Sequence, residues 1–176
     1  MAIGLLSIAA GIAYTGGPYP LAYNGLGDLF VLIFFGGVAT IGTYYVQAQE
    51  VSLLAVLAAI PAGALITNIL VVNNYRDIES DREAGKLTLA VIIGEAGSRL
   101  EYLFFNGVSY LVPLIFFLFF DFSLWVLLPL LSVPLALKNM RMLYSGMSGK
   151  PLNKLLASTA RLCLIYGLLF SAGIIL

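Results

Sequence analysis

The sequence predicts an all-α fold, a polytopic transmembrane helical bundle of about six helices. Of its 176 residues, 61% are hydrophobic and only 10% are charged, whereas soluble domains carry about 25% charged residues. Mean hydropathy is +1.00. The apolar residues gather in runs near the length that crosses a bilayer, and none shows the ten-residue alternation of a membrane barrel. These observations indicate an integral membrane protein.

The first apolar run covers residues 1–14, which is shorter than the roughly 20 residues that span about 30 Å of hydrocarbon. It lacks the basic region and small-residue cleavage site of a secretory signal, so we interpret it as the end of a transmembrane helix. Five further runs are predicted to be spanning helices, at about 28–46, 51–74, 98–120, 123–140 and 153–176.

The distribution of Lys and Arg predicts the orientation, because these residues concentrate in cytoplasmic loops. Two loops are rich in them, and the turns near 47–50 and 120–123 contain none. The basic loops are therefore expected to be cytoplasmic. Counting helices places the loop at 15–27 on the same face and both termini outside.

Several classes of function are excluded by composition. The chain has no histidine and one cysteine, Cys163, which argues against zinc or haem sites, Ser-His triads and disulfide frameworks. The net charge of zero argues against a nucleic-acid partner. Any metal must be bound by oxygen ligands, which suit magnesium, calcium or manganese.

One segment gathers much of the charge. Seven charged residues lie within eleven positions that follow the 51–74 run: Arg76, Asp77, Glu79, Asp81, Arg82, Glu83 and Lys86. If that helix continues past the membrane surface, Asn73, Asp77 and Asp81 share one face. Glu79 falls on the opposite side and is not expected to be a ligand.

Two interpretations of Asp77 and Asp81 remain open from the residues alone. Carboxylates one turn apart repel each other, and a divalent cation such as Mg²⁺ would offset this, since magnesium is commonly held by one or two carboxylates and substrate phosphates. Arg76, Arg82 and Lys86 would then neutralise phosphate oxygens. Alternatively, the segment is a solvated loop that fixes topology, with its aspartates paired to arginines.

The loop at 15–27 is expected on the same face as the aspartates. Its glycines permit tight turns, and Tyr19, Tyr23 and Asn24 are candidates for positioning a substrate. Ordinary turn chemistry and interfacial tyrosines are an equal alternative for each of them. Asp28 follows at a helix start and is expected to act as a helix cap.

Two long motifs give the chain a resemblance to a known family. NNYRDIESDREAGKLTLAVIIG, residues 73–94, resembles the second aspartate-rich motif of the UbiA-type intramembrane prenyltransferases. AYTGGPYPLAYNGLGDLFVLIFFG, residues 13–36, is similar to the preceding loop of the family branch that acts on 1,4-dihydroxy-2-naphthoate in menaquinone biosynthesis. The resemblance covers essentially the whole chain.

The resemblance implies an enzyme that joins a polyprenyl diphosphate to an aromatic acceptor with Mg²⁺ as cofactor. The family fold has nine transmembrane helices, of which the runs here match helices four to nine. By motif position, Asp77 and Asp81 would ligate magnesium with help from Asn73 or Asn74. Lys86, with Arg76 and Arg82, would contact the diphosphate. Tyr19, Tyr23 and Asn24 would position donor or acceptor, and the enzyme would be a multi-pass protein of the cell membrane.

The family's first aspartate motif, of the N-D-x-x-D-x-x-x-D type, is missing from these residues, since Asp28 is the only acid before Glu50. We therefore expect residues 1–176 to form a single transmembrane domain of an N-terminally truncated prenyltransferase with little activity alone. A separate chain carrying the other helices would complete it. The alternatives are a prenyltransferase for another aromatic acceptor and a non-catalytic membrane subunit.

Overall fold

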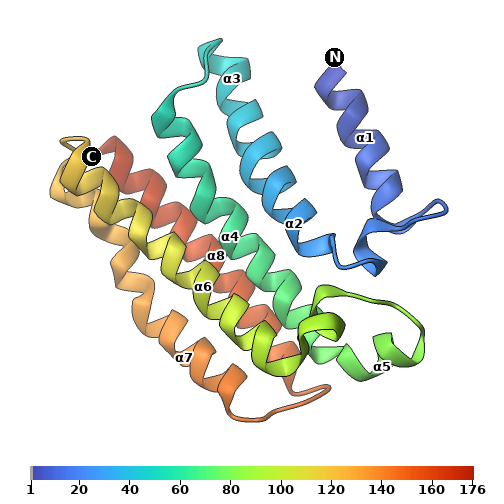
Figure 1. The fold of residues 1–176 in the computed structure, drawn as a ribbon. Helices are drawn as coiled ribbons and strands as arrows, with labels where there is room; N and C mark the ends of the chain where they lie inside the picture. Colours follow the sequence, from blue (N-terminus) through green and yellow to red (C-terminus); the bar gives the residue numbers. More distant parts are fainter. Residues whose placement is uncertain (1) are drawn as a thin grey trace.

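The structure is a computed structural model that describes residues 2–176, with side chains from Gly4 onward, and it is built of helices and loops (Figure 1). Its elements in chain order are α1 (Ala2–Thr15), η1 (Leu21–Tyr23), α2 (Gly27–Val31), η2 (Leu32–Ile41), α3 (Gly42–Ala48), α4 (Leu53–Arg76), α5 (Ile78–Glu83), α6 (Leu89–Phe119), η3 (Leu124–Ser132), α7 (Val133–Tyr144) and α8 (Leu152–Ile175). The predicted all-α class is confirmed.

Membrane-spanning segments account for most of this architecture. Within residues 2–176, five helical segments are long and apolar enough to cross a membrane, and α1 is a shorter apolar helix. The first of the five combines α2, η2 and α3 into one rod, Gly27–Ala48. The chain is therefore a multi-pass membrane protein, and the six predicted runs correspond to these five segments and α1.

The third long span begins earlier than predicted. Its helix α6 starts at Leu89 rather than near residue 98, because the Thr88 hydroxyl accepts a hydrogen bond from the Val91 N–H at 3.4 Å and caps the first turn. This helix is kinked at Gly94. Gly94 adopts φ 69° and ψ −177°, a conformation that glycine reaches without a Cβ penalty.

The fourth span also differs from a simple α-helix. Its first part, η3, is a tighter 3₁₀ segment that contains Pro129, and α7 then continues to Tyr144, beyond the predicted end at 140. Pro134 lies in the first turn of α7, where its missing N–H costs no helical hydrogen bond.

The buried core lies where α4, α6, α7 and α8 pack together. One apolar cluster surrounds Val72, Tyr102 and Leu155, and a second surrounds Leu65, Phe116 and Tyr166. The rod Gly27–Ala48 reaches α4 through a glycine contact, since a Cβ added to Gly36 would lie 3.0 Å from the Cα of Gly63. Helices in membranes approach this closely at small residues.

The loops before η1, before α6 and before α8 meet at one end of the bundle. Figure 1 shows α5 and the turn that precedes α8 at the end opposite to the start of α1 and the end of α8. Two hydrogen bonds link elements at this end. The Leu87 N–H donates to the Tyr23 carbonyl at 3.0 Å, which joins the segment before α6 to η1, and Arg76 Nη1 donates to Asn153 Oδ1 at 2.7 Å, which joins the end of α4 to the start of α8. The predicted convergence of these loops on one face is confirmed.

Candidate functional site

The segment with two aspartates does not continue α4 as a straight helix, which corrects the sequence-based expectation. Helix α4 ends at Arg76, and Asp77 leaves helical geometry with φ −102° and ψ 8°. Its N–H still donates to the carbonyls of Asn73 and Asn74, both at 3.2 Å, so the chain bends without an unpaired group. The short helix α5 then carries Asp81.

Both aspartates nevertheless face one cavity, of about 210 Å³, at the meeting point of the loops. Six predicted site residues line it: Tyr23, Asn73, Asn74, Asp77, Asp81 and Lys86. The remaining lining residues are Tyr14, Thr15, Ala22, Leu70 and Thr88. The fold therefore gathers carboxylate, amide and ammonium groups from α4, α5 and two loops.

Asp77 is oriented by a two-pronged ion pair with its neighbour. Arg76 donates from Nε to Oδ1 at 2.8 Å and from Nη2 to Oδ2 at 2.6 Å. The same guanidinium reaches Asn73 Oδ1 at 2.9 Å and Asn153 Oδ1 at 2.7 Å. Guanidinium and carboxylate groups fix each other's plane in such pairs, so Arg76 ties Asp77 to both α4 and α8.

Asp81 pairs with a different cation. Its carboxylate is 9% exposed at the residue level, and Oδ1 lies 3.3 Å from the ammonium of Lys86. That ammonium also sits 4.9 Å from the centre of the Tyr23 ring, a distance that allows cation–π attraction. Because the backbones of Tyr23 and Leu87 are hydrogen-bonded, η1 and the Lys86 segment are positioned together.

Four predicted residues lie outside this cavity. Arg76 lines an adjacent groove with Ser148, Lys150 and Asn153. Arg82 points toward the exposed Glu79, with which it forms a loose pair at 3.8 Å. Tyr19 is 60% exposed, and the Asn24 side chain donates to the Pro20 carbonyl at 2.7 Å. The structure thus separates Tyr19, Asn24 and Arg82 from the six residues that it brings together, whereas Arg76 lies outside the cavity but contacts Asp77 and Asn73 at its edge.

Asp28 does not cap its helix. The residue at the N-cap of α2 is Leu26, and no side chain caps this end. Asp28 is the second residue of α2, within its first turn. It is 3% exposed, and its Oδ2 is buried without a hydrogen-bond partner among the described residues. Close packing explains this position, because Gly27 brings the chain so near that an added Cβ would lie 3.3 Å from the Tyr14 hydroxyl.

Sequence reasoning did not single out Tyr14 or a polar cluster beside the cavity. Tyr14 lies at the end of an apolar run, directly before Thr15 and two glycines, and this change in composition is the signal that marks it. In the neighbouring cluster, the Tyr75 hydroxyl donates to Glu95 at 3.1 Å and accepts from Arg99 Nη2 at 2.6 Å. The kink at Gly94 brings Glu95 and Arg99 to Tyr75, which helix periodicity does not predict.

The donor set of the cavity fits a hard divalent cation. Within residues 2–176 no group of three His, Cys, Asp or Glu side chains could hold a metal ion by itself. Two carboxylates and two amides do share the cavity, and magnesium is commonly bound by one or two carboxylates and completed by substrate phosphates. The residues present therefore fit Mg²⁺ as part of a ternary site with a phosphorylated ligand.

Comparison with known proteins places this chain among prenyltransferases. Residues 1–170 match the UbiA prenyltransferase family. The chain is 41% identical over 174 residues to the 1,4-dihydroxy-2-naphthoate octaprenyltransferase of Escherichia coli, covering 99% of this chain and 56% of that protein. It is 38% identical over 168 residues to the Mycobacterium tuberculosis protein of the same name, covering 96% of this chain and 56% of that protein.

A mammalian relative has a similar level of sequence identity to this chain. The UbiA prenyltransferase domain-containing protein 1 of Rattus norvegicus is 40% identical over 170 residues, covering 96% of this chain and 48% of that protein. The chain thus spans about half the length of the curated relatives it matches. Because one family model covers nearly all of its residues, the chain belongs to the UbiA prenyltransferase family.

Proposed function

We propose that this chain provides the diphosphate-binding part of a magnesium-dependent prenyltransferase. The enzyme would transfer a polyprenyl group from polyprenyl diphosphate to 1,4-dihydroxy-2-naphthoate in menaquinone biosynthesis. The observation that carries the proposal is the shared cavity of Asn73, Asn74, Asp77, Asp81 and Lys86. Carboxylates, amide oxygens and an ammonium in one small cavity suit a complex of a diphosphate with a divalent cation.

Each residue has a separate task in this proposal. Asp77 and Asp81 would hold Mg²⁺, whose charge stabilises the diphosphate as a leaving group. Lys86 binds a phosphate oxygen directly, and Tyr23 keeps its ammonium above the ring and toward the cavity. Arg76 orients Asp77 through the two-pronged ion pair, and its guanidinium can also donate a hydrogen bond to a phosphate oxygen. These groups are in place before substrate binds, which is the condition for electrostatic catalysis.

An apolar groove adjoins the cavity and supports a long hydrophobic donor. It has a volume of about 390 Å³ and runs between α1 and the rod Gly27–Ala48, with Ala10, Gly11, Phe30 and Phe34 in its walls. Tyr14 lines both the groove and the polar cavity. A donor whose diphosphate lies near Asp81 can therefore extend its first isoprene units past Tyr14 into apolar surroundings.

The acceptor and the location follow from the relatives and from charge. The Escherichia coli and Mycobacterium tuberculosis relatives are named for 1,4-dihydroxy-2-naphthoate, which supports this acceptor over other aromatic ones. The Lys and Arg residues concentrate at the loop end of the bundle, which supports a cytoplasmic site on the cell membrane. Since residues 1–176 contain a single aspartate pair of this kind, we propose that a separate segment or chain supplies the family's first motif.

Donor binding tests the proposal without requiring turnover. The purified chain in detergent is titrated with farnesyl thiodiphosphate, which resists ionisation, in the presence of Mg²⁺ or of EDTA. We expect binding only with Mg²⁺, and we expect Asp77→Asn and Asp81→Asn to abolish it. Glu79→Gln is the matched control, because it removes the same charge from an exposed side chain outside the cavity.

Turnover then tests the identity of the acceptor and the need for the family's first aspartate motif. We expect transfer to 1,4-dihydroxy-2-naphthoate, in preference to 4-hydroxybenzoate, when the chain is co-expressed with helices that carry a first aspartate motif. Full activity of the isolated chain would show that the family's first aspartate motif is not needed. Absence of magnesium-dependent donor binding would instead favour a non-catalytic membrane subunit.

A further inference from the structure

The last third of the chain carries basic residues but no acidic ones. No Asp or Glu follows Asp121, yet five basic residues do: Lys138, Arg141, Lys150, Lys154 and Arg161. The ion pairs in the described part of the chain all involve other residues, namely Arg76, Arg82, Lys86 and Arg99. The basic residues of α7 and α8 therefore have no carboxylate partner among the residues that the structure describes.

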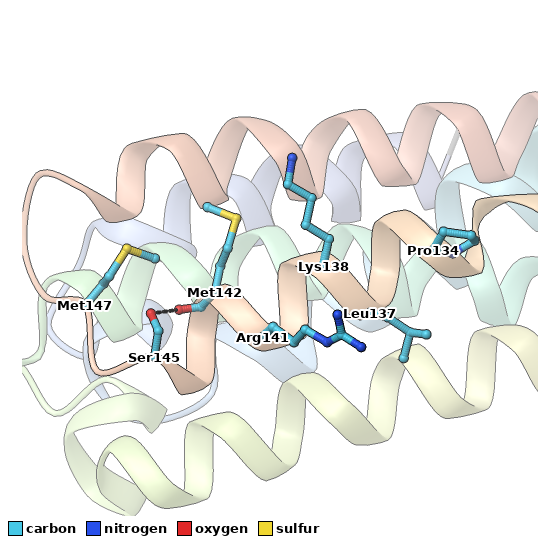
Figure 2. A pocket seen from close by; sticks show the side chains of 7 residues that line it. All are labelled: Pro134, Leu137, Lys138, Arg141, Met142, Ser145 and Met147. Carbon is cyan, nitrogen blue, oxygen red and sulfur yellow. Dashed lines mark hydrogen bonds between the residues drawn. The ribbon is translucent and has the colours of Figure 1, made fainter.

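Two of these cations line a groove on the outer face of α7. The groove has a volume of about 560 Å³ and is lined by Pro134, Leu137, Lys138, Arg141, Met142, Ser145 and Met147. Figure 2 shows Lys138 and Arg141 projecting from the middle of the helix, with Pro134 and Leu137 on one side along its axis and Ser145 and Met147 on the other. The groove is thus basic at its centre and apolar toward the middle of the span.

The depth of the two cations matches the boundary of the hydrocarbon layer. Counting from Leu124 with about 2.0 Å per residue in η3 and about 1.5 Å in α7, Lys138 lies roughly 25 Å along the axis and Arg141 roughly 30 Å. The hydrocarbon core of a bilayer is about 30 Å thick. The backbone of Arg141 therefore lies at the edge of the hydrocarbon layer and that of Lys138 about one turn inside it, from where the long Lys138 side chain can extend to the phosphates. The shorter apolar side chains of Leu137 and Pro134 stay at the level of acyl chains.

We propose that this groove binds the headgroup of an anionic phospholipid. Lys138 and Arg141 are three residues apart on α7 and both line the groove; their side chains extend from different sides of the helix in Figure 2, so a headgroup seated between them accepts from each cation separately. Leu137 and Pro134 pack against the upper part of an acyl chain. A lipid with net negative charge is favoured over a zwitterionic one, because neither cation forms an ion pair with a carboxylate in the described part of the chain. This site is separate from the aspartate cavity and does not rest on the proposed transferase activity.

Native mass spectrometry of the detergent-solubilised chain tests the proposal. Phosphatidylglycerol and phosphatidylcholine with identical acyl chains are titrated against the wild-type chain and against the Lys138→Gln/Arg141→Gln double variant. Each basic residue near an anionic surface contributes about 1 kcal/mol, and 1.4 kcal/mol corresponds to a tenfold change in affinity. We therefore expect the double variant to bind phosphatidylglycerol about 20- to 30-fold more weakly.

The control variant also removes two positive charges, but at positions outside the groove. Lys150→Gln/Lys154→Gln changes the loop before α8 and its first turn, outside the groove, and we expect less than a threefold change. Soluble glycerol 1-phosphate is not expected to displace the lipid, because it lacks the acyl chain. Circular dichroism checks folding, and Lys138→Arg/Arg141→Lys, which keeps both charges, is expected to keep binding if the glutamine variant unfolds.

Several outcomes would overturn the proposal. Equal affinity for the two lipids, or an equal loss in both glutamine variants, would show a general charge effect rather than a site. Displacement by glycerol 1-phosphate would indicate a simple phosphate site. A dimer that dissociates in the Lys138→Gln/Arg141→Gln variant would show that a second copy of the chain covers the groove.

Discussion

Two charged segments of this protein use their cations in opposite ways. Between Asn73 and Thr88, the three basic residues Arg76, Arg82 and Lys86 each have a carboxylate partner. Between Lys138 and Arg161, none of the five basic residues has one within the described residues. Both segments start from the same end of the bundle, so topology alone does not explain the difference.

The basic residues of the first segment form ion pairs with carboxylates of the same chain. Those of the second segment remain available to groups outside the chain. In the first segment, ion pairs fix the carboxylates of Asp77 and Asp81 toward a common cavity. In the second, the basic side chains are exposed and have no carboxylate partner among the described residues, which leaves them available to anions from outside the chain. A count of Lys and Arg treats the two segments alike, whereas the positions of the acids distinguish them.

The largest expected effect comes from removing a carboxylate of the first segment. In an enzyme completed by a first aspartate motif, we expect Asp81→Asn to lower prenyl transfer by about 100-fold or more, since stabilisation of leaving-group charge depends on the bound cation. The measurement is the initial rate of product formation at saturating Mg²⁺. Glu79→Gln should retain nearly full rate, and a comparable loss in that control would mean that the whole segment acts only through its net charge.

A smaller effect should distinguish Lys86 from Arg82, two basic residues of the same segment. Lys86→Gln removes the ammonium that contacts both Asp81 and the Tyr23 ring, and we expect donor affinity to fall about tenfold, as for loss of one charge-assisted hydrogen bond. Arg82→Gln removes equal charge from a loosely paired, exposed side chain and should change affinity less than twofold. Equal losses would place Arg82 in the site as well.

The smallest expected effect concerns the hydrogen bond between Arg76 and Asn153, which links the two segments. Asn153→Ala removes one acceptor from Arg76 but leaves its contacts with Asp77 and Asn73. We expect donor affinity to fall about threefold, since a single hydrogen bond contributes on the order of 1 kcal/mol or less at a partly exposed site. Asn153→Asp keeps an oxygen acceptor and should restore affinity. Failure of this rescue would show that Asn153 acts through its amide nitrogen instead.

The fold was largely predictable because the membrane imposes a strong pattern. Long apolar runs and the location of Lys and Arg identified the spans and the shared face of the loops. The boundaries were less predictable where backbone geometry changes within a run. Thr88 starts α6 nine residues before the predicted 98, and Gly94 bends it, because capping and a positive φ depend on single residues rather than on hydropathy.

The candidate site was predictable in its motif residues and less so in its supporting contacts. Asn73, Asp77 and Asp81 share a cavity even though α4 ends at Arg76, so the expected juxtaposition holds for a different geometric reason than a continuous helix. Tyr14 and Asn153 reach the site from distant parts of the chain. Such contacts depend on how helices pack in three dimensions, and one sequence contains no direct signal for them.

The hydrogen bond between Arg76 and Asn153 also bears on how the protein is made. These residues are 77 positions apart in sequence, so Arg76 leaves the ribosome long before Asn153 does. Asn153 is in the first turn of α8, which is synthesised and inserted after α4. The aspartate segment therefore acquires this anchor only once α8 has been made, which couples maturation of the cavity to insertion of α8.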